Sequence, residues 1–119
     1  MKYGIDKRRK LFKTIIDNLG GELALIICGG AYLDEKYERG MYDLGIQIVN
    51  GYGITECSPL VAVTPYFKRK PGSVGPAVPC NEVRIDGLET NEYGYISGEI
   101  QVKGNNVFLG YYKNEEATA

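Results

Sequence analysis

The sequence predicts an α/β protein in which a βαβ segment of a parallel sheet, residues 1–66, precedes a small antiparallel, β-barrel-like segment, residues 67–119. Two apolar runs, Leu23–Ile27 and Ile46–Val49, predict buried strands, and a helical pattern lies between them. A strand, a helix and a strand in so few residues form a βαβ unit with a right-handed crossover. After residue 66 the pattern changes to short alternating strands separated by turn residues, which is typical of antiparallel pairing.

The first predicted element is an amphipathic helix from Asp6 to Leu19. Its apolar residues recur at helical spacing: Leu11, Phe12, Ile15, Ile16 and Leu19. Asp6 is the expected N-cap, and Gly20-Gly21 ends the helix. The basic run Lys7–Lys10 is interpreted as a solvent-exposed helix start, with a contact to phosphate, to a membrane surface or to a missing neighbouring segment as the alternative.

The βαβ unit comes next. Leu23–Ile27 is continuous and apolar, which predicts a central parallel strand covered on both faces. A second helix is expected from about Asp34 to Leu44, with Asp34 as its N-cap and Gly45 as its stop. The expected inward face of this helix consists of Tyr37, Met41 and Leu44.

The elements after the unit are short. Val61–Val63 predicts a short strand, and Asn81–Asp86 predicts another. Tyr95–Lys103 alternates apolar and polar residues, so it is the expected antiparallel partner. Val107–Tyr112 is the candidate for a third strand, whose tyrosines are expected to pack rather than to bind a ligand. A helix is expected to begin at Glu115.

Composition excludes several classes of function. The net charge of −1 gives no general attraction to nucleic acid, and no apolar run approaches the roughly 20 residues of a transmembrane helix. The chain contains no histidine, which excludes Ser-His-Asp and Cys-His catalysis within it. Its three cysteines, Cys28, Cys57 and Cys80, are too widely spaced for a zinc site and predict buried free thiols. We therefore expect a cytoplasmic protein.

Glycines and polar side chains gather just after the second apolar run. Gly51 and Gly53 leave space for a flat ligand against the backbone, and Tyr52 between them offers a ring or its peptide plane for stacking. Thr55 can donate a hydrogen bond to a phosphate oxygen, and Glu56 can bind a hard cation such as Mg²⁺. These are the parts of a nucleotide-phosphate site. The alternative is a glycine-rich turn with a merely solvated glutamate.

The first strand of the unit also ends in glycines. Because parallel strands bring their carboxyl ends to one edge of a sheet, we expect Gly29, Gly30 and Ala31 to lie beside residues 51–56. Ligands of open α/β sheets bind at such an edge.

Four segments, in order, resemble motifs of the adenylate-forming superfamily, which includes acyl-CoA synthetases, luciferases and peptide-synthetase adenylation domains. Gly51–Glu56 is similar to its Tyr-Gly-x-Thr-Glu core motif, and Cys28–Ala31 to its glycine-glycine-alanine loop. Lys70–Gly75 resembles its Lys-Pro-Gly-x-Val-Gly linker, and Gly98–Gly104 followed by Gly110–Tyr112 resembles its Gly-Glu-Leu-x-Val-x-Gly…Gly-Tyr motif. The resemblance therefore covers nearly the whole chain. Residues 4–12 look most like the bacterial long-chain fatty acid–CoA ligases.

The resemblance implies an acid–thiol ligase that acts in two steps. ATP and a carboxylate give an acyl-adenylate and pyrophosphate with Mg²⁺, and coenzyme A then takes the acyl group. On this basis Tyr52 stacks on adenine, Thr55 binds the α-phosphate and Glu56 binds Mg²⁺. The resemblance implies that the floor of the pocket is shaped by Gly29, Gly30 and Ala31. The substrates would be small molecules, with no nucleic acid and no transmembrane segment, in a cytoplasmic or peripheral membrane enzyme.

Several parts of such an enzyme are not found in the sequence. The Ser/Thr/Gly-rich phosphate loop, the Thr-Gly-Asp motif and the C-terminal domain with its catalytic lysine are missing, so we expect a fragment of a larger N-terminal domain. Such a fragment is expected to be inactive alone, to bind ATP weakly and to self-associate. The alternatives are a non-catalytic α/β binding or interaction module, or an adenylate-forming enzyme for a shorter or aromatic acid.

Overall fold

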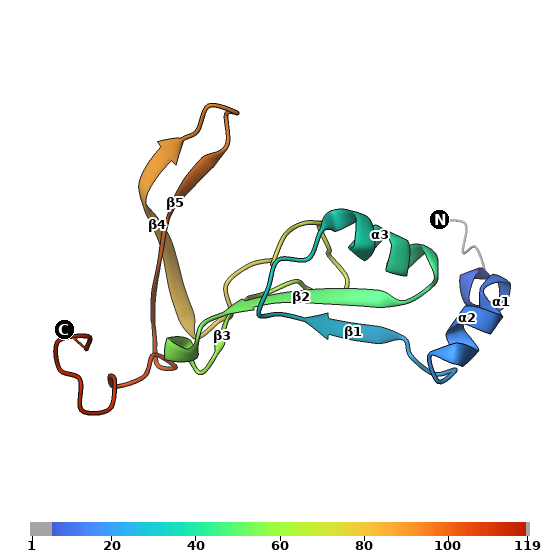
Figure 1. Ribbon diagram of the computed structural model, residues 1–119, viewed down its shortest axis with the longest axis horizontal. Helices are drawn as coiled ribbons and strands as arrows, with labels where there is room; N and C mark the ends of the chain where they lie inside the picture. The colour runs from blue at the N-terminus through green and yellow to red at the C-terminus, as the bar shows by residue number, and fades with distance from the viewer. Residues whose placement is uncertain (1–5, 119) are drawn as a thin grey trace.

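A three-stranded sheet with one helix packed on it forms the centre of the protein, and a separate two-stranded hairpin stands beside it (Figure 1). The structure is a computed structural model that describes residues 6–118. In the larger sheet β1 (Leu25–Cys28) pairs parallel with β2 (Gln47–Gly53), and β2 pairs antiparallel with β3 (Leu60–Val63). The predicted α/β class, with a parallel pair followed by antiparallel strands, is confirmed.

The expected N-terminal helix is divided into α1 (Arg8–Leu11) and α2 (Lys13–Asn18). The break lies at Phe12, whose φ of −99° and ψ of 26° leave the helical region. The expected N-cap is also wrong: Lys7 occupies that position. The Asp6 carboxylate accepts a hydrogen bond from the Arg8 backbone N–H at 3.1 Å and pairs with the Arg8 guanidinium at 2.6 Å. Gly4 and Ile5 lie outside the described residues.

Two cations of the basic run are used inside the fold rather than merely solvated. The Arg8 guanidinium donates to the Tyr42 carbonyl at 2.6 Å and lies 4.2 Å from the centre of the Tyr42 ring. The Arg9 guanidinium donates to the carbonyls of Leu23 (2.6 Å) and Gly21 (2.9 Å). Charged groups on α1 therefore hold this helix against α3 and against the loop that precedes β1.

β1 is an edge strand of the described sheet, which corrects the prediction of a central strand covered on both faces. Its side chains alternate between exposed and half-buried, and Ile27 is 76% exposed. A parallel strand normally has both faces covered. The sequence pattern indicates that this strand is apolar. It does not indicate which of the strand's two faces are covered by other described residues.

α3 (Glu35–Asp43) confirms the second helix, with bounds one residue inside those expected. Asp34 is the N-cap, and its carboxylate accepts the Lys36 N–H at 2.8 Å. Gly45 follows the helix with a φ of +84°, which glycine adopts without strain. The expected inward face is wrong at Tyr37, which is exposed; Met41 and Leu44 are half-buried.

The inward position on α3 belongs to Glu38, which is only 2% exposed. One of its carboxylate oxygens, Oε2, accepts hydrogen bonds from the Asn50 side-chain amide and from the Gly72 backbone N–H, both at 3.1 Å. A buried carboxylate is stable only when donors replace the lost water. Glu38 therefore joins the helix to β2 and to the loop around Gly72.

Apolar side chains of β2 and the residue before it, of β3, and of the short helix between the two strands form the core. The buried apolar residues of this region are Ile46, Ile48, Val49, Cys57, Val61 and Ala62. A further buried apolar side chain is Ile16 of α2. Of the predicted buried thiols, only Cys57 is buried; Cys28 is half-buried and Cys80 is exposed.

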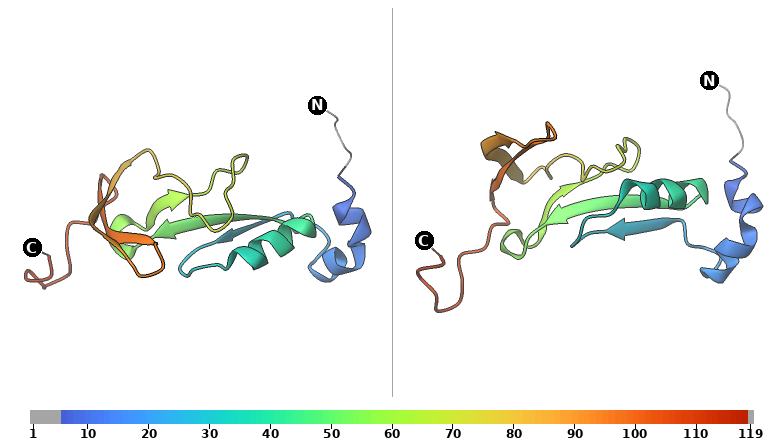
Figure 2. Two further views of the ribbon diagram at one scale, coloured as in Figure 1. Left: turned by 90° about the horizontal axis from the view of Figure 1, so that it is seen from above. Right: turned by 45° about the horizontal axis from the view of Figure 1, so that its top comes forward.

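The antiparallel segment is a hairpin of β4 (Asn81–Thr90) and β5 (Ile96–Gly104), which points away from the sheet (Figures 1 and 2). β4 is longer than expected because Asp86-Gly87 forms a bulge inside it rather than a turn that ends it. Within residues 6–118, Val107–Tyr112 forms no third strand and no helix begins at Glu115. The hairpin stays open and does not close into a barrel.

The chain is elongated, with extents of 56 × 37 × 27 Å and a radius of gyration of 18.6 Å. A compact domain of this length has a radius of gyration of about 13.5 Å. Large apolar side chains such as Leu11, Phe67 and Leu109 consequently remain exposed. None of the helices that residues 6–118 form is long and apolar enough to cross a membrane.

These exposed apolar groups predict that the 119-residue chain self-associates. The unpaired edge of β1, with Ile27 exposed on it, should mediate part of this association. Ile27→Lys should lower the weight-average mass in sedimentation velocity, whereas Asn18→Lys, an equal charge change at an exposed polar site, should not. A monodisperse wild-type monomer would contradict the prediction.

A second prediction concerns Glu38. Glu38→Ala leaves the buried Asn50 amide and the part-buried Gly72 N–H without their acceptor, so the free energy of unfolding should fall by about 1–3 kcal/mol. Glu38→Gln keeps one carbonyl oxygen at this place and should lose less. Urea denaturation followed by circular dichroism measures both changes. An alanine variant as stable as the wild type would show that these hydrogen bonds contribute nothing.

Candidate functional site

The glycine loops after β1 and within β2 lie side by side, as the sequence predicts. A β-carbon added to Gly29 would lie 3.2 Å from the Gly51 carbonyl oxygen. The register explains this closeness, because Cys28 pairs with Asn50 in the parallel ladder. The residues that follow this pair, Gly29 and Gly51, therefore lie with their backbones close together.

An open cleft of about 400 Å³ runs along these two segments. It contains most of the predicted site residues: Gly29, Gly30, Gly51, Tyr52, Gly53 and Thr55. Ala31 is not among them; it lines a smaller neighbouring hollow together with Ser73 and Val74. Glu56 lies beyond the lining of the cleft, on the short helix that follows.

The glycine motif lies inside a strand rather than past its end, which corrects the sequence prediction. β2 continues to Gly53 because its last residues pair antiparallel with β3. The ladder is irregular between Tyr52 and Gly53, where a bulge turns the strand. A β-carbon on Gly53 would lie 2.1 Å from the Pro59 carbonyl oxygen, so only glycine fits. The same oxygen accepts the Ile54 N–H at 2.8 Å.

Thr55 and Glu56 are held on η1 (Thr55–Cys57), a single 3₁₀ turn. Ser58 ends this turn in the left-handed conformation, with a φ of +56°. Thr55 is exposed at its start and Cys57 is buried at its end. The buried thiol anchors the turn, while the hydroxyl and the carboxylate stay accessible beside the cleft.

The Glu56 carboxylate has a partner from the far end of the chain. The Tyr111 hydroxyl donates a hydrogen bond to Glu56 Oε1 at 2.5 Å. This hydrogen bond lowers the pKa of the Glu56 carboxyl below its ordinary value and raises the pKa of Tyr111. Glu56 is therefore ionised at neutral pH. No local pattern could have shown this pair, because 55 residues separate its members.

The geometry combines a glycine-walled cleft, an exposed hydroxyl and an ionised carboxylate at one end of a sheet. Such an arrangement can hold a flat group against bare backbone, with an anion near the hydroxyl. Among residues 6–118, no three Cys, Asp or Glu side chains gather as a metal cage. A cation at Glu56 would therefore need further ligands from a bound substrate.

A sequence profile of the AMP-binding enzyme family matches residues 4–112. The chain belongs to the AMP-binding enzyme family. The resemblance of the four motifs to adenylate-forming enzymes is thereby confirmed.

Individual relatives agree with the family assignment. A long-chain-fatty-acid–CoA ligase of Mycobacterium bovis is 34% identical over 110 residues, which cover 92% of this chain and 17% of the relative. Long-chain-fatty-acid–CoA ligase 1 of Homo sapiens is 34% identical over 116 residues, or 93% of this chain and 16% of the relative. The chain thus spans about a sixth of the length of these relatives.

Solved structures have the same fold. MatB of Rhodopseudomonas palustris matches with a TM-score of 0.63 and 30% identity, over 98% of this chain and 28% of that one. An anthranilate CoA ligase in complex with anthranoyl-AMP matches with a TM-score of 0.68 over 82% of this chain and 19% of that one. At 20% identity, the second likeness shows the fold alone.

The close approach at Gly53 gives a paired prediction. Gly53→Ala should lower the free energy of unfolding by about 1–3 kcal/mol, because a methyl group collides with rigid backbone. Gly40 in α3 has open space around its α-carbon, so Gly40→Ala should raise that free energy by about 1 kcal/mol through helix propensity. Thermal unfolding followed by circular dichroism tests both. Equal effects of the two changes would contradict the proposed collision.

Proposed function

We propose that this chain forms part of the ATP site of an acyl-CoA synthetase that activates a long-chain fatty acid. The observation that carries the proposal is the segment 51–55, which lines the cleft beside Gly29 within a matched AMP-binding sequence, with Glu56 next to it on the turn that follows. The reaction would join carboxylate and ATP into an acyl-adenylate with release of pyrophosphate. The thiol of coenzyme A would then take the acyl group.

The nucleotide would lie along the cleft. The backbone of Gly29, Gly30 and Gly51 would form its wall, and the half-buried Tyr52 would stack on the adenine. Gly53 and Thr55 follow in the same wall, where the exposed Thr55 hydroxyl could donate to the α-phosphate. Ala31 lies on the neighbouring hollow, so its part in the site would be to shape the floor.

Glu56 is the proposed Mg²⁺ ligand. Magnesium is commonly held by one or two carboxylates together with substrate phosphates and water. Glu56 is ionised and, among the described residues, belongs to no cluster of three metal-binding side chains, so it fits this use better than an all-protein metal cage. When bound, Mg²⁺ would neutralise the phosphates and allow Glu56 to stand close to them.

The proposed division of the chain into residues 1–66 and 67–119 follows the change from the βαβ unit to antiparallel structure. Residues just past the boundary return to β3: the Val63 N–H donates to the Pro76 carbonyl at 3.1 Å, and the Val78 N–H donates to the Val61 carbonyl at 2.9 Å. These bonds would hold the second part against the first. We further propose a cytoplasmic enzyme, or one peripheral to a membrane.

The role of Glu56 can be tested in the complete protein. Glu56→Gln should lower the rate of Mg²⁺-dependent adenylate formation with a long-chain fatty acid by about a hundredfold or more, because a neutral amide replaces the negative carboxylate that would bind the metal. ATP–pyrophosphate exchange measures this rate, and circular dichroism checks the fold. Glu99→Gln, at an exposed carboxylate of β5, serves as the matched control. An unchanged exchange rate in Glu56→Gln would remove this residue from the site.

A further inference from the structure

The segment between β5 and the C-terminal loop crosses back to η1 and binds it at three points. The Asn106 side-chain amide donates to the Cys57 carbonyl at 2.6 Å. The Phe108 backbone N–H donates to the Glu56 carbonyl at 2.8 Å, and the Tyr111 hydroxyl reaches Glu56 Oε1. Two of these contacts hold backbone, whereas the third holds the carboxylate itself.

Tyr111 is itself held in place, so its hydroxyl is a fixed donor. Its ring meets the Phe108 ring edge-on, with centroids 4.8 Å apart and planes at 87°. Its backbone N–H donates to the Thr118 hydroxyl at 3.0 Å. Gly110 permits this close return, because a β-carbon there would lie 2.3 Å from the Thr118 methyl group.

The hydroxyl leaves one carboxylate oxygen of Glu56 available. Tyr111 occupies Oε1, and no side chain of another described residue donates to Oε2, although the backbone N–H of Glu56 itself also hydrogen-bonds to this carboxylate. A glutamate on an exposed turn otherwise samples several side-chain rotamers, and ordering it lowers the affinity of any ligand that needs one of them. A fixed donor on one oxygen removes much of that disorder and directs the other oxygen outward.

We propose that Tyr111 is a positioning residue, which orients the Glu56 carboxylate toward the metal of a bound metal–nucleotide. The inference rests on the proposed function, since it requires a cation at Glu56. Tyr111 would not touch the cation or the nucleotide. It would act only through the hydrogen bond to Glu56.

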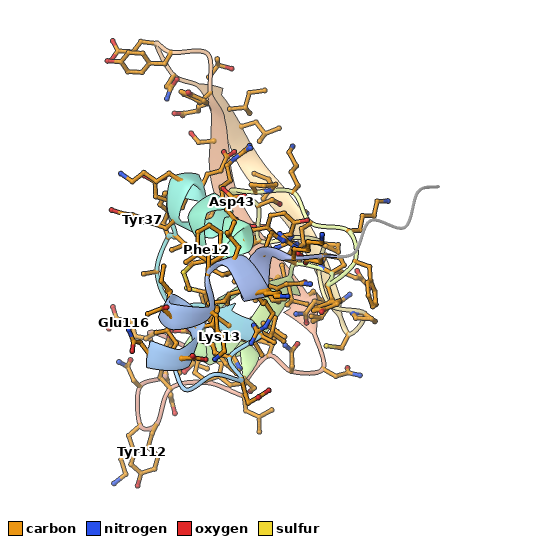
Figure 3. The ribbon with its side chains drawn as sticks, turned by 90° about the vertical axis from the view of Figure 1, so that its right-hand side faces the viewer. Phe12, Lys13, Tyr37, Asp43, Tyr112 and Glu116 are labelled. Atoms are coloured by element: carbon orange, nitrogen blue, oxygen red, sulfur yellow. The ribbon has the colours of Figure 1, made fainter. Side chains whose placement is uncertain are left out.

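The neighbouring tyrosine provides a matched control. Tyr112 is 89% exposed and projects from the end of the loop (Figure 3). Its ring lies near the Lys113 ammonium group, 5.2 Å from the ring centre. Tyr112→Phe removes the same group as Tyr111→Phe, a phenolic hydroxyl, from the next residue along the chain, and should not affect Glu56.

The test is a binding measurement on the complete protein and needs no turnover. Isothermal titration calorimetry gives the dissociation constant of ATP in Mg²⁺ and in EDTA, and the ratio of the two reports how much the metal strengthens binding. Tyr111→Phe should reduce this ratio by about three- to tenfold, the range of one hydrogen bond, while the EDTA value stays unchanged. Tyr112→Phe should leave both dissociation constants unchanged. Glu56→Gln should bring the ratio close to one, because Mg²⁺ then no longer strengthens ATP binding.

Combined variants separate a positioning role from a structural one. In the Glu56→Gln background, Tyr111→Phe should have no further effect on the ratio. A Tyr111→Phe variant that weakens ATP equally in Mg²⁺ and EDTA, or that keeps the wild-type ratio, would overturn the inference. If Glu56→Gln also keeps the wild-type ratio, the proposed metal role of Glu56 fails, and the inference about Tyr111 fails with it.

Discussion

The parallel register of β1 against β2 places the two glycine loops that form the cleft. Because Cys28 pairs with Asn50, the glycines that follow each residue meet at one edge of the sheet. A slip of one residue would reverse the faces of the strand and bring a side chain against this backbone. The cleft exists because two strands reach their glycines at the same level. Part of its wall is therefore bare backbone, at Gly29, Gly30, Gly51 and Gly53.

The buried carboxylate of Glu38, on the helix that packs against β2, stabilises this register. It joins α3 to Asn50, the residue just before the glycine motif, and to the loop at Gly72. Hydrogen-bonded polar groups in a core make it specific for one arrangement, because another arrangement leaves these groups unpaired. The end of β2 is thus fixed by a polar contact at the point where the cleft begins. Apolar packing alone would allow more freedom there.

The site also depends on residues far along the chain. η1 carries the threonine and the glutamate, and the segment from Asn106 to Tyr111 returns to hold it. The hairpin between them stands apart from the sheet, as Figure 2 shows. In an elongated protein, few other tertiary contacts hold a given segment in place. Each of these hydrogen bonds therefore contributes more to the shape of the site than it would in a compact domain.

The sequence by itself determined the class of fold, the βαβ unit, the bounds of α3 and the meeting of the two glycine loops. Each follows from local chemistry, such as the Asp34 cap, the Gly45 stop and the run of apolar residues in β1. Only the tertiary structure decided that Glu38 rather than Tyr37 faces inward, that the first helix breaks at Phe12, and that Tyr111 binds Glu56. The reason is physical: helical spacing and turn chemistry act over a few residues, whereas a buried carboxylate or a tyrosine hydroxyl is placed by partners that only the folded chain brings near.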